Sequence, residues 1–556
     1  MTEAYTPSKP AKKYIDYGRD AHGMQRRRKP KAQSPNYVLR LNMIDAAAQV
    51  LDEIQTFTHP ADAMLAHYFK RNAHLGQRDR AWMSSLVWHV LRHKRLLAQL
   101  AQSGAASFSR RLALLALART QGLPACELHS TQDERTWLAQ TLTLPIDSMA
   151  PAVQASLPDW LYAAMAAAYS PAQLASLCPA LLDAAPLVLR ANTLKADRDA
   201  VMAKLAYKQI PASIHPLTPW AIALGTHPVL AKLDAYNDGW VEVQDAGSQV
   251  LALLTDAKRG QMVADFCAGA GGKTLALGAM MRNTGRLYAF DVNDARLKRL
   301  QPRLARSGLS NIAPIVIDSE ADPKLKRLAG KFDRVLVDAP CSGMGTLRRN
   351  PDLKWRQHPR DVTELAAKQS RILASAARLV KPEGRLVYAT CSVLPAENQD
   401  VVRAFLAANP AFSVLPADAE CVRMGVVLPD GAILDGGMLQ LLPSSDAFSS
   451  DGFFAAVLVR GTAPASALAS ASAPALAETE TAVFAAQADK ADAGSDDGAK
   501  VAVKPMSKRA SKAAVKPAPE PAAEPASENT ASPAVPAKKA ARKTKPKATT
   551  IAATEG

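Results

Sequence analysis

The chain has 556 residues, of which 48% are hydrophobic, and it carries a formal net charge of +17 at pH 7. No apolar run approaches the roughly 20 residues of a membrane span, the N-terminus lacks the apolar stretch of a signal peptide, and the six cysteines include no CxxC pair. We therefore expect a reduced, cytoplasmic protein without a zinc ribbon or thioredoxin motif. The positive charge predicts a polyanionic partner, with nucleic acid as the leading candidate, although charge alone leaves an anionic membrane surface open.

The first 145 residues divide into a basic arm and a helical region. Residues 1–36 are polar and basic, and we interpret them as a disordered arm that either solubilises the chain or contacts RNA phosphates. In residues 37–145, apolar side chains recur at spacings of three and four, as at Leu41, Ile44 and Ala48. This period predicts an all-α bundle, whose basic residues form either a solvated face or an RNA-binding face.

A small α+β module is predicted at residues 146–238. We predict a helix at residues 152–169 from their apolar content, and a second helix at residues 197–205 that begins with an acidic residue. Short strands are expected at 186–192 and 222–224, between segments rich in proline and glycine.

From residue 239 to residue 461, apolar strands alternate with helices. We predict strands at 262–266, 286–291, 313–318, 334–338 and 385–390, and helices at 247–254, 273–281, 294–307 and 363–379. This alternation predicts an α/β domain with a mostly parallel sheet covered on both faces, and residues 453–459 supply a late strand that could be antiparallel. Residues 462–556 are rich in alanine, proline and lysine and almost lack aromatic residues, so we predict a disordered tail.

A glycine-rich turn follows the first strand of the α/β domain. The sequence CAGAGGKT at 267–274 matches neither the dinucleotide loop nor the P-loop, and alone it could be only a tight turn. The next strand ends in Asp291, about 20 residues beyond Gly271, which is the separation at which a carboxylate can bind ribose hydroxyls. Four successive strands carry a carboxylate at or near their ends, namely Asp265, Asp291, Asp318 and Asp338. These features predict an adenosine cofactor without a phosphate chain, with Asp318 placed to reach the adenine amino group or a bridging water.

Two cysteines differ in context from the others. Cys341 and Cys391 each follow a strand that ends in a polar loop, where chemistry collects in an open α/β sheet. The two thiols could meet over one active site if their strands are neighbours. We expect the remaining cysteines outside the glycine-rich turn to be small buried hydrophobes, and these are Cys126, Cys178 and Cys421.

Six motifs in order resemble the S-adenosylmethionine-dependent RNA cytosine methyltransferases of the RsmB/Sun (Fmu) and Nop/NSUN group. They are QDAGSQ at 244–249, CAGAGGKT at 267–274, DAPCSG at 338–343, RRNPDLKW at 348–355, YATCS at 388–392 and EN at 397–398. The resemblance covers roughly residues 180–460 and implies a Rossmann-like class I methyltransferase domain. Residues 37–145 are similar to the NusB-like domain that precedes the catalytic part in the RsmB branch.

The resemblance also implies the cofactor, the substrate class and the roles of individual residues. S-adenosylmethionine would be the cofactor and RNA the partner, with ribosomal RNA favoured by the NusB-like region and no metal required. Cys391 would attack carbon 6 of cytosine, Cys341 would assist release of the methylated base, and Asp338 would hydrogen-bond the N3/N4 edge. The residues implied to contact the cofactor are Cys267, Ala268, Gly269, Ala270, Gly271, Gly272, Lys273, Asp291, Asp318 and Asp338.

Several alternatives stay open at this point. DNA cytosine methyltransferases attack with the cysteine of a Pro-Cys motif, which here would make Cys341 the nucleophile. Thiolate formation needs positive charge nearby, which Lys354 or Arg348 could supply. The family usually has proline where this chain has Ala270, and its common Gly-Arg after Asp318 is replaced. Transfer RNA is an alternative substrate, and a non-catalytic RNA-binding or ribosome-assembly factor is an alternative function.

Overall fold

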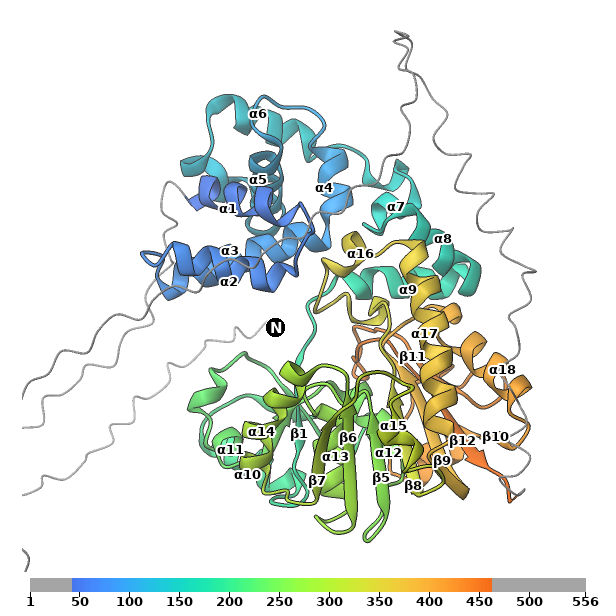
Figure 1. The fold of residues 1–556 in the computed structure, drawn as a ribbon. Coiled ribbons are helices and arrows are strands. Elements are labelled where there is room, and N and C mark those ends of the chain that lie inside the picture. Colours follow the sequence, from blue (N-terminus) through green and yellow to red (C-terminus); the bar gives the residue numbers. More distant parts are fainter. Residues whose placement is uncertain (1–42, 463–556) are drawn as a thin grey trace, which may run out of the picture. The chain divides into compact units, whose positions relative to one another are not determined.

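The computed structural model describes residues 43–462 (Figure 1). The predicted basic arm at 1–36 and all but the first residue of the predicted tail lie outside the described residues. Within residues 43–462, no helix is both long enough and apolar enough to cross a membrane.

Residues 43–141 form the helical region that the sequence period predicts. The helices are α1 (Met43–Ile54), α2 (Ala61–Arg71), α3 (Gln77–Arg92), α4 (Lys94–Leu100), α5 (Phe108–Gln121), a 3₁₀ helix (Leu123–His129) and α6 (Gln132–Thr141). One hydrophobic core joins them, with α5 buried along most of its length against α1 and α3. The helical character of this region is therefore confirmed, and its NusB-like identity stays a prediction.

The single helix predicted at 152–169 is wrong, because the chain breaks in its middle. The structure has two helices, α7 (Pro151–Gln154) and α8 (Asp159–Ala168), followed by α9 (Pro171–Leu182). Ser156 adopts a left-handed φ of 50°, and Pro158, two residues further on, cannot donate a helical hydrogen bond. Helices α8 and α9 pack on residues that follow the two predicted strand-end cysteines.

Residues 187–243 form a four-stranded antiparallel sheet with short helices. Its strands are β1 (Leu187–Ala191), β2 (Ala212–Ile214), β3 (Ala221–Leu224) and β4 (Val241–Val243), in the order β2-β3-β1-β4. Helices α10 (Arg198–Tyr207) and α11 (Asp234–Asn237) accompany it. Strand β4 joins this sheet although it lies beyond residue 238, where we placed the end of the module.

The large sheet has the mostly parallel character that the strand–helix alternation predicts. Its strands are β5 (Met262–Phe266), β6 (Arg286–Asp291), β7 (Ile312–Val316), β8 (Phe332–Asp338), β9 (Val380–Thr390), β10 (Phe412–Leu415), β11 (Leu439–Leu441) and β12 (Phe453–Arg460). Strands β5 to β9 pair in parallel in the order β9-β8-β5-β6-β7, and β12 pairs antiparallel with β9. The Rossmann-like fold and the antiparallel late strand are thus confirmed.

Alternating side chains of these strands enter two separate cores, one on each face of the sheet. In β8, Leu336 lies in the core beneath α12 (Ala246–Leu254), α13 (Gly272–Met280) and α19 (Ala417–Arg423), whereas Val335 and Val337 lie in the opposite core. Helices α17 (Pro359–Ala377) and α18 (Gln399–Ala408) cover that second face. The remaining helices of the domain are α14 (Asp294–Ser307), α15 (Pro323–Lys326) and α16 (Leu353–Arg356). Burial on both faces fixes which residues point toward each core and leaves the carboxyl ends of the strands free for a site.

Candidate active site

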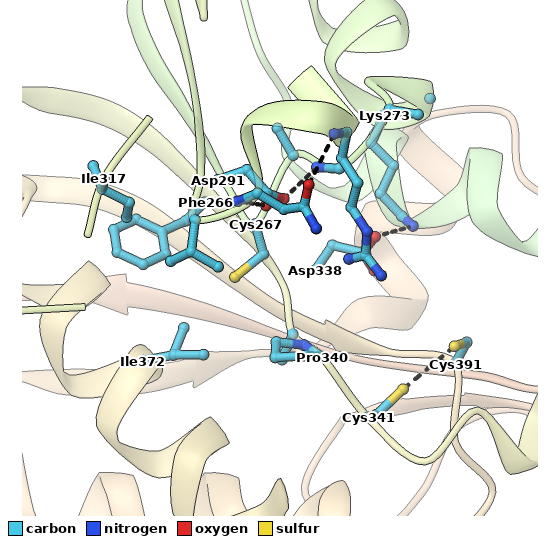
Figure 2. Close-up of a pocket in the computed structure, with 18 of the residues that line it drawn as sticks. Phe266, Cys267, Lys273, Asp291, Ile317, Asp338, Pro340, Cys341, Ile372 and Cys391 are labelled. Carbon is cyan, nitrogen blue, oxygen red and sulfur yellow. Dashed lines mark hydrogen bonds and ion pairs between the residues drawn. The ribbon is translucent and has the colours of Figure 1, made fainter. Parts of the chain in front are cut away.

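A cavity of about 600 Å³ lies at the carboxyl ends of β5, β6, β8 and β9. It is lined at one end by apolar side chains and at the other by polar and sulfur-containing ones (Figure 2). Phe266, Ile317, Pro340 and Ile372 form the apolar end, and Lys273, Asp338, Cys341 and Cys391 form the polar end. The volume lies within the range of about 300–1,000 Å³ that is usual for small-molecule sites.

The loop between β5 and α13 forms one wall of the cavity. Its backbone is held close to β6, because the amides of Cys267 and Ala268 both donate to the carbonyl of Phe290, at 3.0 and 2.8 Å. The carbonyl of Ala270 accepts from Nη1 of Arg303 at 2.6 Å, and the carbonyl of Gly272 accepts from Nη1 of Arg190 at 2.7 Å. Arginines of α14 and of the small sheet therefore support the loop from behind.

Gly271 contributes to this loop by its shape and not by lining the cavity. It has a left-handed φ of +83°, and a Cβ atom at this position would lie 2.2 Å from Cδ1 of Leu300. The loop can therefore turn and pack on α14 only with glycine here.

Of the four strand-end carboxylates, Asp291 and Asp338 line the cavity, whereas Asp265 and Asp318 do not. Asp291 lines the cavity, and its carboxylate accepts from the amides of Gly269 and Asn293, both at 2.7 Å. The side chain of Asp318 is exposed and lies outside the lining, where Ile317 and Glu320 are found instead. Apart from its position after the third strand, nothing in the sequence marked Glu320 as a lining residue.

Asp265 lies beneath the loop and is fully buried. Its Oδ2 accepts from the hydroxyl of Thr274 at 2.6 Å, and Oδ1 has no hydrogen-bond partner. Burial raises the pKa of Asp265 to about 7, which the hydrogen bond from Thr274 only partly offsets. Asp265 is therefore a structural group of the loop, whereas Asp338, at the end of β8, reaches the cavity.

An ion pair joins the loop to β8 inside the cavity. Nζ of Lys273, whose side chain is largely buried, lies 2.8 Å from Oδ2 of Asp338. Burial lowers the pKa of Lys273, but Asp338 and, more weakly, Cys391 outweigh it and hold that pKa above its ordinary value. Lys273 is therefore a buried cation that interacts with Cys391.

The structure brings Cys341 and Cys391 into contact. Their strands β8 and β9 are parallel neighbours with Asp338 opposite Ala389, and the two Sγ atoms lie 3.3 Å apart (Figure 2). The contact with the Cys391 thiol and burial, with the Glu397 carboxylate nearby, raise the pKa of Cys341 well above the ordinary cysteine value. A thiolate is therefore disfavoured at Cys341.

Glu397 connects the two cysteine loops from below. This buried carboxylate accepts from the amide of Ser342 at 2.8 Å and from its hydroxyl, and from the hydroxyl of Ser392 at 2.6 Å. A fourth hydrogen bond of 3.0 Å comes from Nε2 of Gln369 in α17. Since Ser342 and Ser392 each follow one of the cysteines, this single carboxylate sets the spacing of the two thiols.

Neither Lys354 nor Arg348 supplies the charge beside the thiols. Nζ of Lys354 donates at 2.7 Å to the carbonyl of Arg92 in the helical region, and burial lowers the pKa of Lys354 to about 7. Arg348 is buried against Ser444, Ser449 and Asp451. With Trp355, whose indole N–H donates to the carbonyl of Leu91 at 3.0 Å, this motif connects the helical region to the α/β domain.

In residues 43–462, the structure has no group of three or more histidine, cysteine or acidic side chains arranged to hold a metal ion.

Comparisons with known proteins agree with this geometry. Residues 252–459 match the model of the 16S rRNA methyltransferase RsmB/F family, and residues 157–229 match that of an RsmF/B-like ferredoxin-like domain. The chain is 39% identical over 305 residues to the ribosomal RNA small subunit methyltransferase B of Sodalis glossinidius, and 36% identical over 304 residues to that of Vibrio vulnificus.

Those matches cover 55% and 54% of this chain and 66% of each relative, so the matched segment spans just under two thirds of the relatives' length. Among solved structures, that of PH0851 is similar with a TM-score of 0.61 and 24% identity, over 76% of this chain and 99% of that chain. This last likeness shows the fold alone.

Proposed function

The chain belongs to the RsmB/F family of methyltransferases, and we propose that it transfers a methyl group from S-adenosylmethionine to carbon 5 of a cytosine in ribosomal RNA. The observation that carries this proposal is the pair of thiols in contact at the polar end of the cavity, which Lys273 and Asp338 also line. Carbon 5 of cytosine is a poor nucleophile, and addition of a thiolate to carbon 6 makes it reactive.

The cavity fits the proposed cofactor. Its apolar end offers Phe266 and Ile317 to a planar base, and Asp291 lies at the end of β6, where a carboxylate can accept from ribose hydroxyls. The cofactor, when bound, supplies an electrophilic methyl group. We propose that residues 267–273 and Asp291 hold it, with Glu320 and not Asp318 nearest to the base.

We assign Cys391 as the nucleophile and Cys341 as its partner. Cys391 is in contact with Cys341 and lines the cavity together with the buried Lys273 cation, which pairs with Asp338. Cys341 keeps its proton, which disfavours the alternative in which the Pro-Cys cysteine attacks. Addition of the Cys391 sulfur to carbon 6 moves electrons toward N3, and carbon 5 then takes the methyl group.

Asp338 and Cys341 would serve the steps around that transfer. The Asp338 carboxylate, oriented by Lys273, can accept a hydrogen bond from the amino group of cytosine and so hold its N3/N4 edge. After carbon 5 loses its proton, the Cys391–carbon 6 bond breaks and the methylated base leaves. We propose that Cys341, in contact with Cys391, assists this release.

The remaining parts of the chain would position the RNA. A base inside a duplex hides carbon 6, so the target cytosine must be unpaired or flipped out. The contacts of Lys354 and Trp355 with the helical region hold that region against the catalytic part, and the net charge of +17 suits phosphate contacts that weaken as salt rises.

Product analysis tests this proposal. Purified protein is incubated with labelled S-adenosylmethionine and either unmodified small-subunit ribosomal RNA or transfer RNA, and the labelled nucleoside is identified after digestion. We expect 5-methylcytidine from the ribosomal RNA and none with Cys391→Ala, whereas the control Cys178→Ala, outside the cavity, retains transfer. Label in transfer RNA alone, or on another atom of cytosine, would contradict the proposed substrate or chemistry, and no label with either RNA would favour a binding factor.

A further inference from the structure

The contact between Cys341 and Cys391 has a chemical consequence beyond methyl transfer. Both side chains line the cavity and both are partly exposed, so a small oxidant can reach them from solvent. Among the described residues, the structure records no other contact between two cysteine sulfurs. The pair is therefore the one place in residues 43–462 where two thiols are poised to react with each other.

We propose that Cys341 and Cys391 form a reversible oxidative modification site, in which a hydroperoxide converts the two thiols into a disulfide that closes the active site. In the first step the Cys391 thiolate attacks the O–O bond, giving a sulfenic acid at Cys391 and releasing hydroxide or an alkoxide. In the second step the Cys341 sulfur displaces that hydroxyl as water, forming the S–S bond. The two electrons lost by the thiols reduce the hydroperoxide, and a dithiol reductant reverses the reaction.

The surroundings of the pair favour both steps. The buried Lys273 cation lines the same cavity as Cys391, and positive charge near a thiol favours its attacking, deprotonated form. Cys341 already lies against Cys391, and a disulfide of about 2.05 Å requires the sulfurs to approach by only ~1.2 Å from their 3.3 Å separation. Glu397 accepts hydrogen bonds from both Ser342 and Ser392, so one buried carboxylate ties together the two loops that carry the sulfurs.

The resolving thiol also determines whether oxidation is reversible. A sulfenic acid with no neighbouring thiol is oxidised further to a sulfinic acid, which dithiols do not reduce. Cys341 therefore protects Cys391 by capturing the first oxidation product. Inactivation of methyl transfer by the disulfide rests on the proposed role of Cys391, whereas formation of the disulfide rests on the geometry alone.

Thiol counting tests this inference without any activity assay. The full chain is treated with hydrogen peroxide, denatured and alkylated, and its free thiols and non-reduced peptides are identified by mass spectrometry. We expect the six thiols to fall to four, a peptide in which Cys341 is linked to Cys391, and recovery of six after dithiothreitol. With Cys341→Ser, we expect sulfinic acid at Cys391 that dithiothreitol does not remove, and Cys178→Ala serves as the matched control that still loses two thiols.

The inference would be overturned if all six thiols stayed free at peroxide concentrations that oxidise free cysteine. It would also be overturned if Cys391 formed as much sulfinic acid in the wild type as in Cys341→Ser. Methyl transfer measured on the same samples should fall with the loss of the two thiols and return with dithiothreitol. A disulfide that forms in a protein without any transfer activity would leave this site intact and refute the proposed function instead.

Discussion

Replacing Glu397 with glutamine should loosen both cysteine loops at once. The buried carboxylate accepts four hydrogen bonds, from the amide and hydroxyl of Ser342, the hydroxyl of Ser392 and the amide of Gln369. Hydrogen bonds to a charged group contribute about 1.5–3 kcal/mol each, compared with about 0.5–1.5 kcal/mol for neutral ones. Since the amide can accept at one end only, we expect Glu397→Gln to lower the free energy of unfolding by about 2–4 kcal/mol.

The same substitution should slow methyl transfer more than it weakens cofactor binding. A displacement of about 1 Å in a reacting group can reduce a rate on the order of 100-fold, and Glu397 determines the position of both thiols without touching the cavity. We therefore expect kcat to fall by about that factor while KM for S-adenosylmethionine changes little. Thermal unfolding and single-turnover transfer measure the two effects.

Two further variants make this prediction specific. Glu364→Gln removes an exposed carboxylate that pairs with Arg360 in the same domain, and it should cost at most about 0.5 kcal/mol with no change in kcat. Glu397→Asp keeps the charge and should lie between Glu397→Gln and the wild type. A Glu397→Gln protein that unfolds and transfers like the Glu364→Gln protein would refute the positioning role.

Three other substitutions test the loop and its charges. Gly271→Ala should lower the free energy of unfolding by roughly 3 kcal/mol or more and weaken cofactor binding. Gly330 has a similar left-handed φ, but no atom lies near the position of an added Cβ, so the control Gly330→Ala should cost only about 1 kcal/mol in thermal unfolding. Burial in the folded state raises the pKa of Asp265 from 3.8 to about 7, so the folded protein binds this proton more tightly than the unfolded chain does. The proton therefore contributes to the free energy of unfolding at pH 4, and that contribution is lost as the pH rises through 7. Asp265→Asn should therefore remove up to about 4 kcal/mol of the loss in the free energy of unfolding between pH 4 and pH 8, as measured by thermal unfolding. The same pH dependence in the variant and the wild type would contradict the raised pKa of Asp265. Lys273→Met should slow transfer about tenfold or more, because Asp338 loses the ammonium group that pairs with it at 2.8 Å. Transfer at the wild-type rate would exclude that role.

The sequence predicted the strands and loops of the catalytic domain well, because local signals determine them. Apolar runs bounded by glycine or aspartate marked β5, β6 and β8 within a residue or two at each end, and Asp197 marked the start of α10 by capping it. The strand β9 was less predictable, since it begins at Val380 and continues through Pro382 and Gly384, residues that usually end a strand. An irregular register opposite β8 accommodates them.

The partners of the reactive residues could not be read from the sequence. Lys273 lies more than 100 residues from Cys391 along the chain, and only the parallel pairing of strands places both at one edge of the sheet. Lys354 was an equally suitable candidate by residue type, but its Nζ donates to the carbonyl of Arg92 in the helical region. Glu397 was visible only as part of a motif, and its link to both cysteine loops depends on the fold of three segments.

Covalent trapping tests the central claim, that Cys391 attacks and Cys341 assists release. The wild type, Cys391→Ala and Cys341→Ala are incubated with S-adenosylmethionine and unmodified small-subunit ribosomal RNA, and the products are separated on a denaturing protein gel. We predict no transfer and no adduct for Cys391→Ala, and a stable protein–RNA band for Cys341→Ala. A stable band with Cys391→Ala and an inactive Cys341→Ala without a band would reverse the two roles and contradict the account.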